Sequence, residues 1–193
     1  MKTLRYRRHS IKDGLVKDTI GEKGIALAIA EGQKDGDNDI FPDHVFHGEL
    51  VRTAQTALAY TYGLESGVKP MQVVPEIGSQ TLFSELANDA LRQAVSEGAS
   101  NFEAIIKAHG VDVAKVYAAN AADGVVAMLE ACDDDDVAIA FGHSPIIELA
   151  AWALTGFGTL TDELSKLSDL EGIVFQMDDE GDVEVIGKIA VEK

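Results

Sequence analysis

Two histidines and two arginines stand at points of the sequence where they could bind and transfer a phosphate group. Arg8 and His9 are adjacent near the N-terminus. Arg52 follows in the first turn of a predicted helix, and His143 comes directly after a predicted strand. An arginine guanidinium presents a planar fork that matches phosphate oxygens and keeps its charge at all relevant pH values. A histidine can act as a nucleophile that divides one difficult transfer into two easier steps.

The sequence around His143 is typical of a turn from a strand into a helix. The apolar run at 137–141 has the composition of a strand covered on both faces. Gly142 permits a tight turn, and Ser144 and Pro145 suit the N-cap and the first helical position. A helix N-terminus favours an anion because its backbone N–H groups are unpaired. Taken alone, however, the segment is equally compatible with a purely structural turn.

The wider pattern alternates short strands with helices. We predict strands at 3–7, 44–47, 71–74, 137–141, 173–177 and 183–191, and helices at 18–31, 50–62, 81–97, 101–109, 111–132 and 145–154. This order predicts an α/β fold, a three-layer α/β/α sandwich with a mostly parallel central sheet and an antiparallel C-terminal edge. Ligands of such sheets bind beyond the carboxyl ends of the strands, which is where the two histidines and two arginines fall.

Composition and charge exclude several classes of function. The 193 residues are 46% apolar and 25% charged, which is ordinary globular composition. The formal net charge of −17 argues against nucleic acid or an anionic membrane as a partner, because both require a basic face. No stretch has the length of a membrane helix, no signal peptide is evident, and the single cysteine, Cys132, excludes an internal disulfide. We therefore expect a cytoplasmic protein.

The basic side chains are concentrated at one end of this acidic chain. Residues 1–23 hold seven of them and only three acidic side chains. Such a concentration indicates either a focused anion site or a solvated charged edge strand.

Three segments together resemble the signatures of the histidine phosphatase (phosphoglycerate mutase-like) superfamily. The pair Arg8-His9 resembles its arginine–histidine motif after the first strand. The segment 52–57, Arg-Thr-Ala-Gln-Thr-Ala, is similar to its arginine-led helix after the second strand. The segment 142–145, Gly-His-Ser-Pro, is similar to its second-histidine turn. Their order, spacing and flanking strands agree with the family from residue 3 to about residue 154.

The resemblance implies phosphoryl transfer through a covalent phosphohistidine. His9 would be the nucleophile, while Arg8, Arg52 and His143 would bind the phosphate oxygens. These side chains can supply the charge that phosphoryl transfer needs, and no cluster of metal ligands is evident, so we expect no metal ion and no cofactor. The implied partner is a phosphorylated small molecule or a phosphoprotein.

The leaving alkoxide still needs a proton, which the family takes from a carboxylic acid soon after the third strand. Glu76, directly after the segment 71–75, is the best-placed candidate, and Glu85 is its rival. A nearby phosphate would raise the pKa of Glu76, as a general acid requires. The alternative interpretation of Glu76 is a solvated loop glutamate.

The chain departs from the family after the first motif. Phosphoglycerate mutases and many relatives continue with glycine and a Glu/Ser–Trp-Asn type sequence, whereas residues 10–14 here are Ser-Ile-Lys-Asp-Gly. This difference favours a histidine acid phosphatase-like phosphomonoesterase over a phosphoglycerate mutase-type transferase, which stays an alternative beside a weakly active phosphate-binding or interaction module. In the family the region at about 76–136 caps the site, so we expect a helical cap-forming insertion within a single domain of residues 1–193.

Overall fold

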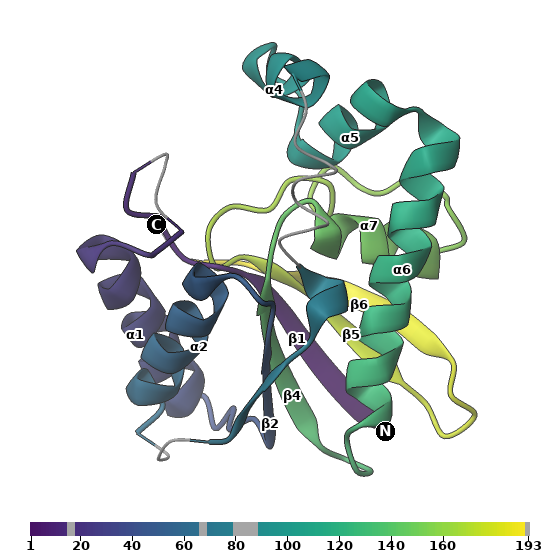
Figure 1. Ribbon diagram of the computed structural model, residues 1–193. Coiled ribbons are helices and arrows are strands. Elements are labelled where there is room, and N and C mark those ends of the chain that lie inside the picture. The colour runs from purple at the N-terminus through teal and green to yellow at the C-terminus, as the bar shows by residue number, and fades with distance from the viewer. Residues whose placement is uncertain (15–17, 66–68, 79–88, 192–193) are drawn as a thin grey trace.

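The computed structural model describes residues 1–14, 18–65, 69–78 and 89–191 (Figure 1). Its strands are β1 (Lys2–Arg8), β2 (His44–His47), β3 (Met71–Val73), β4 (Val137–Gly142), β5 (Gly172–Met177) and β6 (Val183–Ile189). Its helices are α1 (Glu22–Asp37), α2 (Val51–Gly63), α4 (Asp89–Ser96), α5 (Asn101–His109), α6 (Val111–Glu130) and α7 (Ile146–Leu154), with a 3-10 turn η1 (Pro75–Ile77). The predicted helix at 81–97 lies partly outside the described residues, and α4 is its described part. Within those ranges no helix has the length and apolar character needed to cross a membrane.

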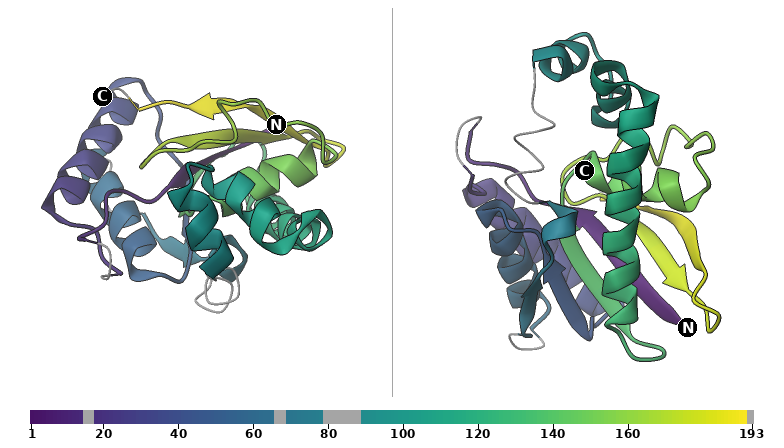
Figure 2. Two further views of the ribbon diagram at one scale, coloured as in Figure 1. Left: turned by 90° about the horizontal axis from the view of Figure 1, so that it is seen from above. Right: turned by 45° about the vertical axis from the view of Figure 1, so that its right-hand side comes forward.

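The strands form one sheet in the order β3-β2-β4-β1-β5-β6. Strands β3, β2, β4 and β1 are parallel, whereas β5 pairs antiparallel with both β1 and β6. Strands β5 and β6 are joined by a hairpin turn, in which the Asp178 N–H donates to the Asp182 carbonyl. Helices lie on both faces of the sheet (Figures 1 and 2). The predicted three-layer α/β/α sandwich with an antiparallel C-terminal edge is therefore confirmed.

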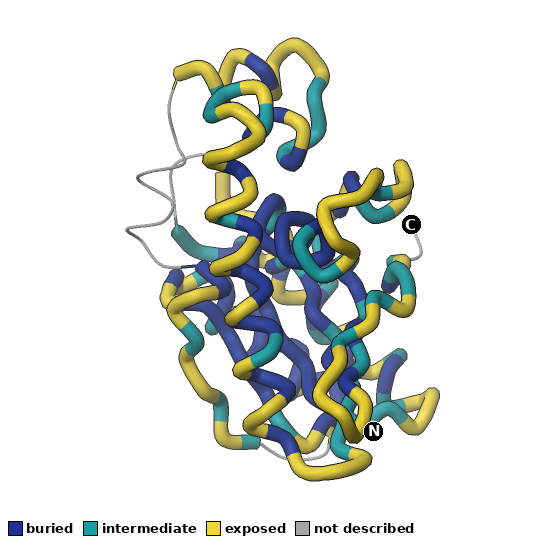
Figure 3. Tube along the Cα trace, turned by 90° about the vertical axis from the view of Figure 1, so that its right-hand side faces the viewer, coloured by how far each residue is buried: buried dark blue, intermediate teal, exposed yellow. Residues whose placement is uncertain are grey.

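Alternate residues of the central strands face two separate cores. Leu4 and Tyr6 of β1 pack in the core that α6 and α7 cover. Val45 and Ile139, from β2 and β4, pack in the core that α1 and α2 cover. Residues 138–141 of β4 are all fully buried, as expected of a strand covered on both faces. Figure 3 shows the buried strands at the centre of the molecule and a more exposed helical region at one end.

A buried charge network ties β1 to α1 and α2. Arg7 donates from Nη1 to Glu31 at 3.0 Å and from Nη2 to Asp35 at 2.8 Å. The Tyr60 hydroxyl donates to the same Asp35 carboxylate at 2.6 Å. Because a buried charge is costly unless it is paired, this network fixes the side chains of β1 that face α1. The next residue, Arg8, points to the other face of the sheet.

Two glycines allow α1 and α2 to approach each other closely. A Cβ atom added to Gly32 would lie 2.1 Å from the carbonyl oxygen of Tyr60, and one added to Gly63 would lie 2.1 Å from that of Ile29. No larger residue fits such contacts without a shift of the backbone. The crossing therefore sets the position of α2, whose first turn carries Arg52.

Two predicted helix starts are wrong, and in both cases a side chain has another partner. Helix α1 begins at Glu22 rather than residue 18, because the Asp18 carboxylate accepts from the backbone N–H of Val51 instead. Pro145 occupies the N-cap position of α7 rather than its first helical position. Ser144 does not cap a backbone N–H of α7, because its hydroxyl bonds the Glu148 side chain.

Helices α4 and α5 and the first half of α6 stand above the carboxyl ends of the parallel strands (Figures 1 and 2). Ser100 begins α5 with a capping box, in which its hydroxyl accepts from the Glu103 N–H and the Glu103 carboxylate accepts from the Ser100 N–H. The interpretation of about 76–136 as a cap-forming insertion within a single domain stays a prediction.

Candidate active site

His9 follows β1 directly, and its ring is held in one tautomer. Its backbone N–H donates to the Gly142 carbonyl at 2.9 Å, and its Nδ1 lies 2.6 Å from the Ser10 carbonyl oxygen. Because a carbonyl only accepts, Nδ1 carries the hydrogen of the neutral ring and the lone pair is on Nε2. Burial lowers the pKa of His9 to about 3. The charges of Arg52 and Arg8 lower it further, whereas the hydrogen bond with Ser10 raises it. The ring is therefore neutral, with an unprotonated Nε2.

Ser10 anchors the carbonyl that orients His9. Its backbone N–H donates to Oγ1 of Thr56 at 3.1 Å, and its hydroxyl donates to the Gly24 carbonyl at 2.7 Å. Ser10 is fully buried. The loop after β1 is thus attached to both α1 and α2, which keeps the His9 ring in place.

His143 lies beside His9 with its ring tautomer also defined. The two ring centroids are 5.0 Å apart at an interplanar angle of 61°. Nη2 of Arg52 lies 3.3 Å from Nδ1 of His143. A guanidinium only donates, so Nδ1 accepts and Nε2 carries the hydrogen that can be given to a phosphate oxygen. Burial, followed by the proximity of His9 and Arg52, holds the pKa of His143 well below its ordinary value.

Arg52 is oriented by a carboxylate from a different segment. Asp18 accepts from Nη1 of Arg52 with one oxygen, and from the backbone N–H of Val51, at 3.1 Å, with the other. This carboxylate stabilises the N-terminus of α2, where a cation alone is disfavoured by the helix dipole. It also leaves Nη2 of Arg52 directed at His143.

Arg8 is the last residue of β1 and is held from the other side of the site. Nη1 donates to the Leu167 carbonyl at 2.7 Å, and Nη2 lies 3.3 Å from the Asp169 carboxylate. Its charge contributes to the lowered pKa values of both His9 and His143. The structure thus gathers the two predicted histidines and two predicted arginines at one end of the sheet. Their roles stay predictions.

Glu76, the predicted general acid, lies in η1 and is exposed. The 3-10 turn lies next to the start of α2, because the Gly78 carbonyl that follows it accepts a hydrogen bond from the Glu49 N–H at 3.2 Å. The Glu76 Cβ faces α6, where a Cβ atom added to Gly124 would lie 2.9 Å from it. Its role as the acid stays a prediction. The rival Glu85 lies outside the described residues.

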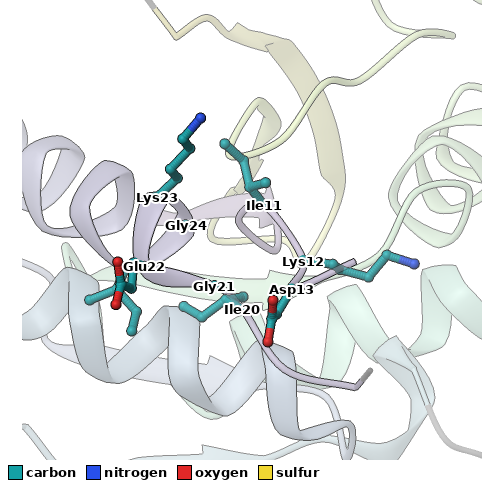
Figure 4. Close-up of a pocket in the computed structure, with 9 residues that line it drawn as sticks. Ile11, Lys12, Asp13, Ile20, Gly21, Glu22, Lys23 and Gly24 are labelled. Carbon is teal, nitrogen blue, oxygen red and sulfur yellow. The ribbon is translucent and has the colours of Figure 1, made fainter. Parts of the chain in front are cut away.

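A groove of about 520 Å³ lies beside the loop after β1, lined by residues 11–13 and 20–25 (Figure 4). The side chains of Lys12 and Lys23 extend in different directions there. The Lys12 charge contributes to the lowered pKa of His9. Across the described ranges, no group of three or more His, Cys, Asp or Glu side chains is placed to hold a metal ion.

The residues that support this centre were not predicted from the sequence. Asp18 and Asp169 hold the two arginines, and Glu148 is fully buried one turn after His143. Glu148 did carry a signal, because it is the one charged residue in the apolar stretch 146–157. The two aspartates carry none, because nothing in their local sequence indicates a distant arginine.

No protein-family model matches the chain, and no curated protein matches it in sequence. Solved structures do match it over almost its full length. Phosphoserine phosphatase from Entamoeba histolytica, in complex with 3-phosphoglyceric acid, has a TM-score of 0.66 at 14% identity over 100% of this chain and 98% of its own.

Two further structures have the same architecture. Phosphoglycerate mutase from Bacillus anthracis has a TM-score of 0.62 at 18% identity, over 95% of this chain and 90% of its own. The protein histidine phosphatase SixA, complexed with tungstate, has a TM-score of 0.58 at 10% identity, over 97% of this chain and 96% of its own. With its sheet order and its paired histidines at the strand ends, the chain has the fold of the histidine phosphatase (phosphoglycerate mutase-like) superfamily.

Proposed function

We propose that this chain is a phosphomonoester hydrolase that works through a phosphohistidine on His9. The observation that carries the proposal is the tautomer of His9. Its Nδ1–H is committed to the Ser10 carbonyl at 2.6 Å, which leaves the Nε2 lone pair for attack. The lowered pKa keeps this lone pair unprotonated throughout the neutral range.

In the first step, Nε2 of His9 attacks phosphorus and the bond between phosphorus and the ester oxygen breaks. The guanidinium groups of Arg8 and Arg52 and the Nε2–H of His143 bind the non-bridging oxygens, whose charge they stabilise. The leaving alkoxide takes a proton from a carboxylic acid and departs as an alcohol. Glu76 is our proposed acid.

In the second step, a water molecule attacks phosphorus and the bond between phosphorus and Nε2 breaks. The proton of the water goes to the carboxylate that was left in the first step, and inorganic phosphate departs. The protein therefore returns to its starting state. Both steps draw their positive charge from side chains of the chain itself, so the proposed reaction is metal-independent and uses no cofactor.

The substrate class we propose is a small phosphometabolite or a phosphoprotein. Support comes from the named activities of the similar structures, a phosphoserine phosphatase and a protein histidine phosphatase. The likeness to a phosphoglycerate mutase keeps transfer to a second alcohol as the alternative. The segment 10–14 favours hydrolysis, because it lacks the glycine and the Glu/Ser–Trp-Asn type sequence with which mutases continue the first motif.

Trapping the intermediate tests the proposal. The protein is mixed with phenyl phosphate labelled at phosphorus, in the presence of a chelator, and then quenched. We expect a label on the protein that is stable in base and labile in acid, and no label on His9→Ala. The control is His44→Ala, because His44 is the first residue of β2, at the opposite end of the strands from His9, and bonds Asp136.

Label that persists in His9→Ala would contradict the assignment of the nucleophile. Release of the label to water supports the hydrolase, whereas its transfer to added 3-phosphoglycerate supports the mutase alternative. Phosphate binding without any label would indicate a binding module instead.

A further inference from the structure

Glu148 is a buried carboxyl group for which the proposed reaction has no use. It lies in the first turn of α7, a helix whose other residues are apolar, and it is fully buried. Its hydrogen-bond partner is not a cation but the Ser144 hydroxyl, whose Oγ lies 2.6 Å from Oε1. Oε2 is also buried and makes no hydrogen bond of ordinary geometry. Since a buried ionisable group is costly, its presence so close to His143 requires an explanation.

Glu148 and Ser144 belong to a chain of hydrogen bonds that reaches the helical region above the site. Nδ2 of Asn101, at the start of α5, donates to Oγ of Ser144 at 3.1 Å. A hydroxyl has one hydrogen to donate and two lone pairs to accept with. When Glu148 is ionised, Ser144 donates to it. When Glu148 is protonated, Ser144 accepts from both Glu148 and Asn101, and its own hydrogen becomes available to a third group.

That third group would lie in a pocket of about 220 Å³ between α5, α7 and the segment before β5, to whose lining Ser144 and Glu148 contribute. The pocket adjoins the phosphate site in two ways. Ser144 directly follows His143, and Leu167, which also lines the pocket, accepts from Nη1 of Arg8 through its carbonyl. A phosphate bound by Arg8 and His143 would therefore have this pocket at its side.

The protonation state of Glu148 can change near neutral pH. Burial raises the pKa of Glu148 to about 7. The hydrogen bond with Ser144, the backbone N–H groups of Glu148 and Leu167, and the charge of Arg8 act in the opposite direction and lower it. The other titratable groups near it are Tyr6 of β1, whose pKa Glu148 helps to raise, and Lys166, which lines the same pocket. A carboxyl group with such a pKa is well suited to general acid catalysis.

We propose that Ser144 and Glu148 form a second proton source for the leaving group, beside Glu76. As the bond between phosphorus and the ester oxygen breaks, that oxygen takes the hydrogen of the Ser144 hydroxyl. Oγ of Ser144 takes the carboxylic hydrogen of Glu148, which becomes ionised. During hydrolysis of the phosphohistidine, the proton of the attacking water returns to Glu148 through Ser144. This inference rests on the proposed function, and it assigns a pocket to the alcohol part of the substrate.

The test compares two esters that differ in their need for an acid. Ethyl phosphate has a poor leaving group that must be protonated, whereas 4-nitrophenyl phosphate does not need protonation. In a Glu76→Ala background, where Glu76 no longer supplies a proton, we expect Glu148→Gln and Ser144→Ala each to lower kcat for ethyl phosphate by about tenfold to a hundredfold, while kcat for 4-nitrophenyl phosphate stays within about twofold. The double variant should be no slower than either single one, because the two residues act as a unit.

The pH profile adds a readout that a structural role would not change. The ratio of ethyl to 4-nitrophenyl turnover should fall above about pH 7 as Glu148 ionises, and this fall should vanish in Glu148→Gln. The matched control is Glu130→Gln, an exposed glutamate at the far end of α6. Equal losses for both esters would overturn the relay, because they would indicate only a displaced His143. Unchanged ethyl phosphate turnover, with the phosphohistidine still formed, would overturn the relay and leave the proposed function standing. Absence of a phosphohistidine in the unsubstituted protein would overturn both.

Discussion

Nη2 of Arg52 lies 3.3 Å from Nδ1 of His143, although 91 positions separate the two residues along the chain. The same guanidinium is held through Nη1 by the Asp18 carboxylate. Arg52 therefore does two things at once. It keeps His143 in the tautomer that can donate from Nε2, and in the proposed reaction it also supplies its own charge to a phosphate oxygen.

Arg52→Lys should separate charge from geometry. A lysine keeps the positive charge but has no planar fork that reaches Asp18 and His143 together. We expect kcat/KM for phenyl phosphate to fall by about tenfold to a hundredfold. The control is Arg92→Lys, since Arg92 is an exposed residue of α4 that pairs with Asp89. Steady-state kinetics of the two variants provide the comparison, and an unaffected Arg52→Lys would contradict the placement of Arg52 on the phosphate.

Glu76→Ala should impair alkyl esters more than aryl esters. If Glu76 protonates the leaving oxygen, its loss matters only where that oxygen is strongly basic. In a Glu148→Gln background, where Glu76 is the remaining proposed proton source, we expect turnover of ethyl phosphate to fall about tenfold or more, with little change for 4-nitrophenyl phosphate. If Glu76→Ala leaves the turnover of each ester unchanged, Glu76 is a solvated surface residue rather than the acid.

Glu148→Gln should make the protein more stable at high pH. The pKa of Glu148 is raised from 4.5 to about 7 in the folded state, so folding favours its protonated form. Its contribution is therefore most favourable at low pH and is lost as the pH rises from about 4.5 through 7. Glutamine does not ionise, so we expect a gain of about 3 kcal/mol in the free energy of unfolding at pH 8. Urea unfolding at pH 4 should show much less difference, and an equal gain at both pH values would contradict the raised pKa.

Gly32→Ala should destabilise the fold through the contact of α1 with α2. Its Cβ would lie 2.1 Å from the Tyr60 carbonyl oxygen, so the helices would have to separate. We expect a loss of about 3 kcal/mol or more in the free energy of unfolding. The control is Gly187→Ala in β6, where an added Cβ has no atom within 4 Å. Chemical denaturation of both variants measures the difference, and similar midpoints would contradict the close helix crossing.

The sequence predicted the positions of three site residues, because His9 and His143 directly follow strands and Arg52 lies in the first turn of the helix that follows β2. Once the strands are arranged in parallel, their carboxyl ends meet at one edge, and residues far apart in sequence come together. The layers and the antiparallel C-terminal edge followed in the same way from the alternation of strands and helices. These features depend on local patterns, and local patterns are what a single sequence records.

The supporting residues could not be predicted for the opposite reason. Asp18 lies in a stretch that reads as the start of a helix, yet its carboxylate bonds the first turn of a different helix. Ser144 has the residue type of an N-cap, yet it bonds the side chain of Glu148. In both cases the partner is chosen by tertiary packing, which competes with local preference and leaves no periodic signal.

Each of the two arginines already has a carboxylate beside it, Asp18 for Arg52 and Asp169 for Arg8. A phosphate group that arrives must share these cations rather than find them unpaired. In the proposed reaction the same carboxylates are still in place after the ester is cleaved, and they compete with orthophosphate for the guanidinium groups. We therefore expect the centre to release its product readily, so that inhibition by orthophosphate is weak.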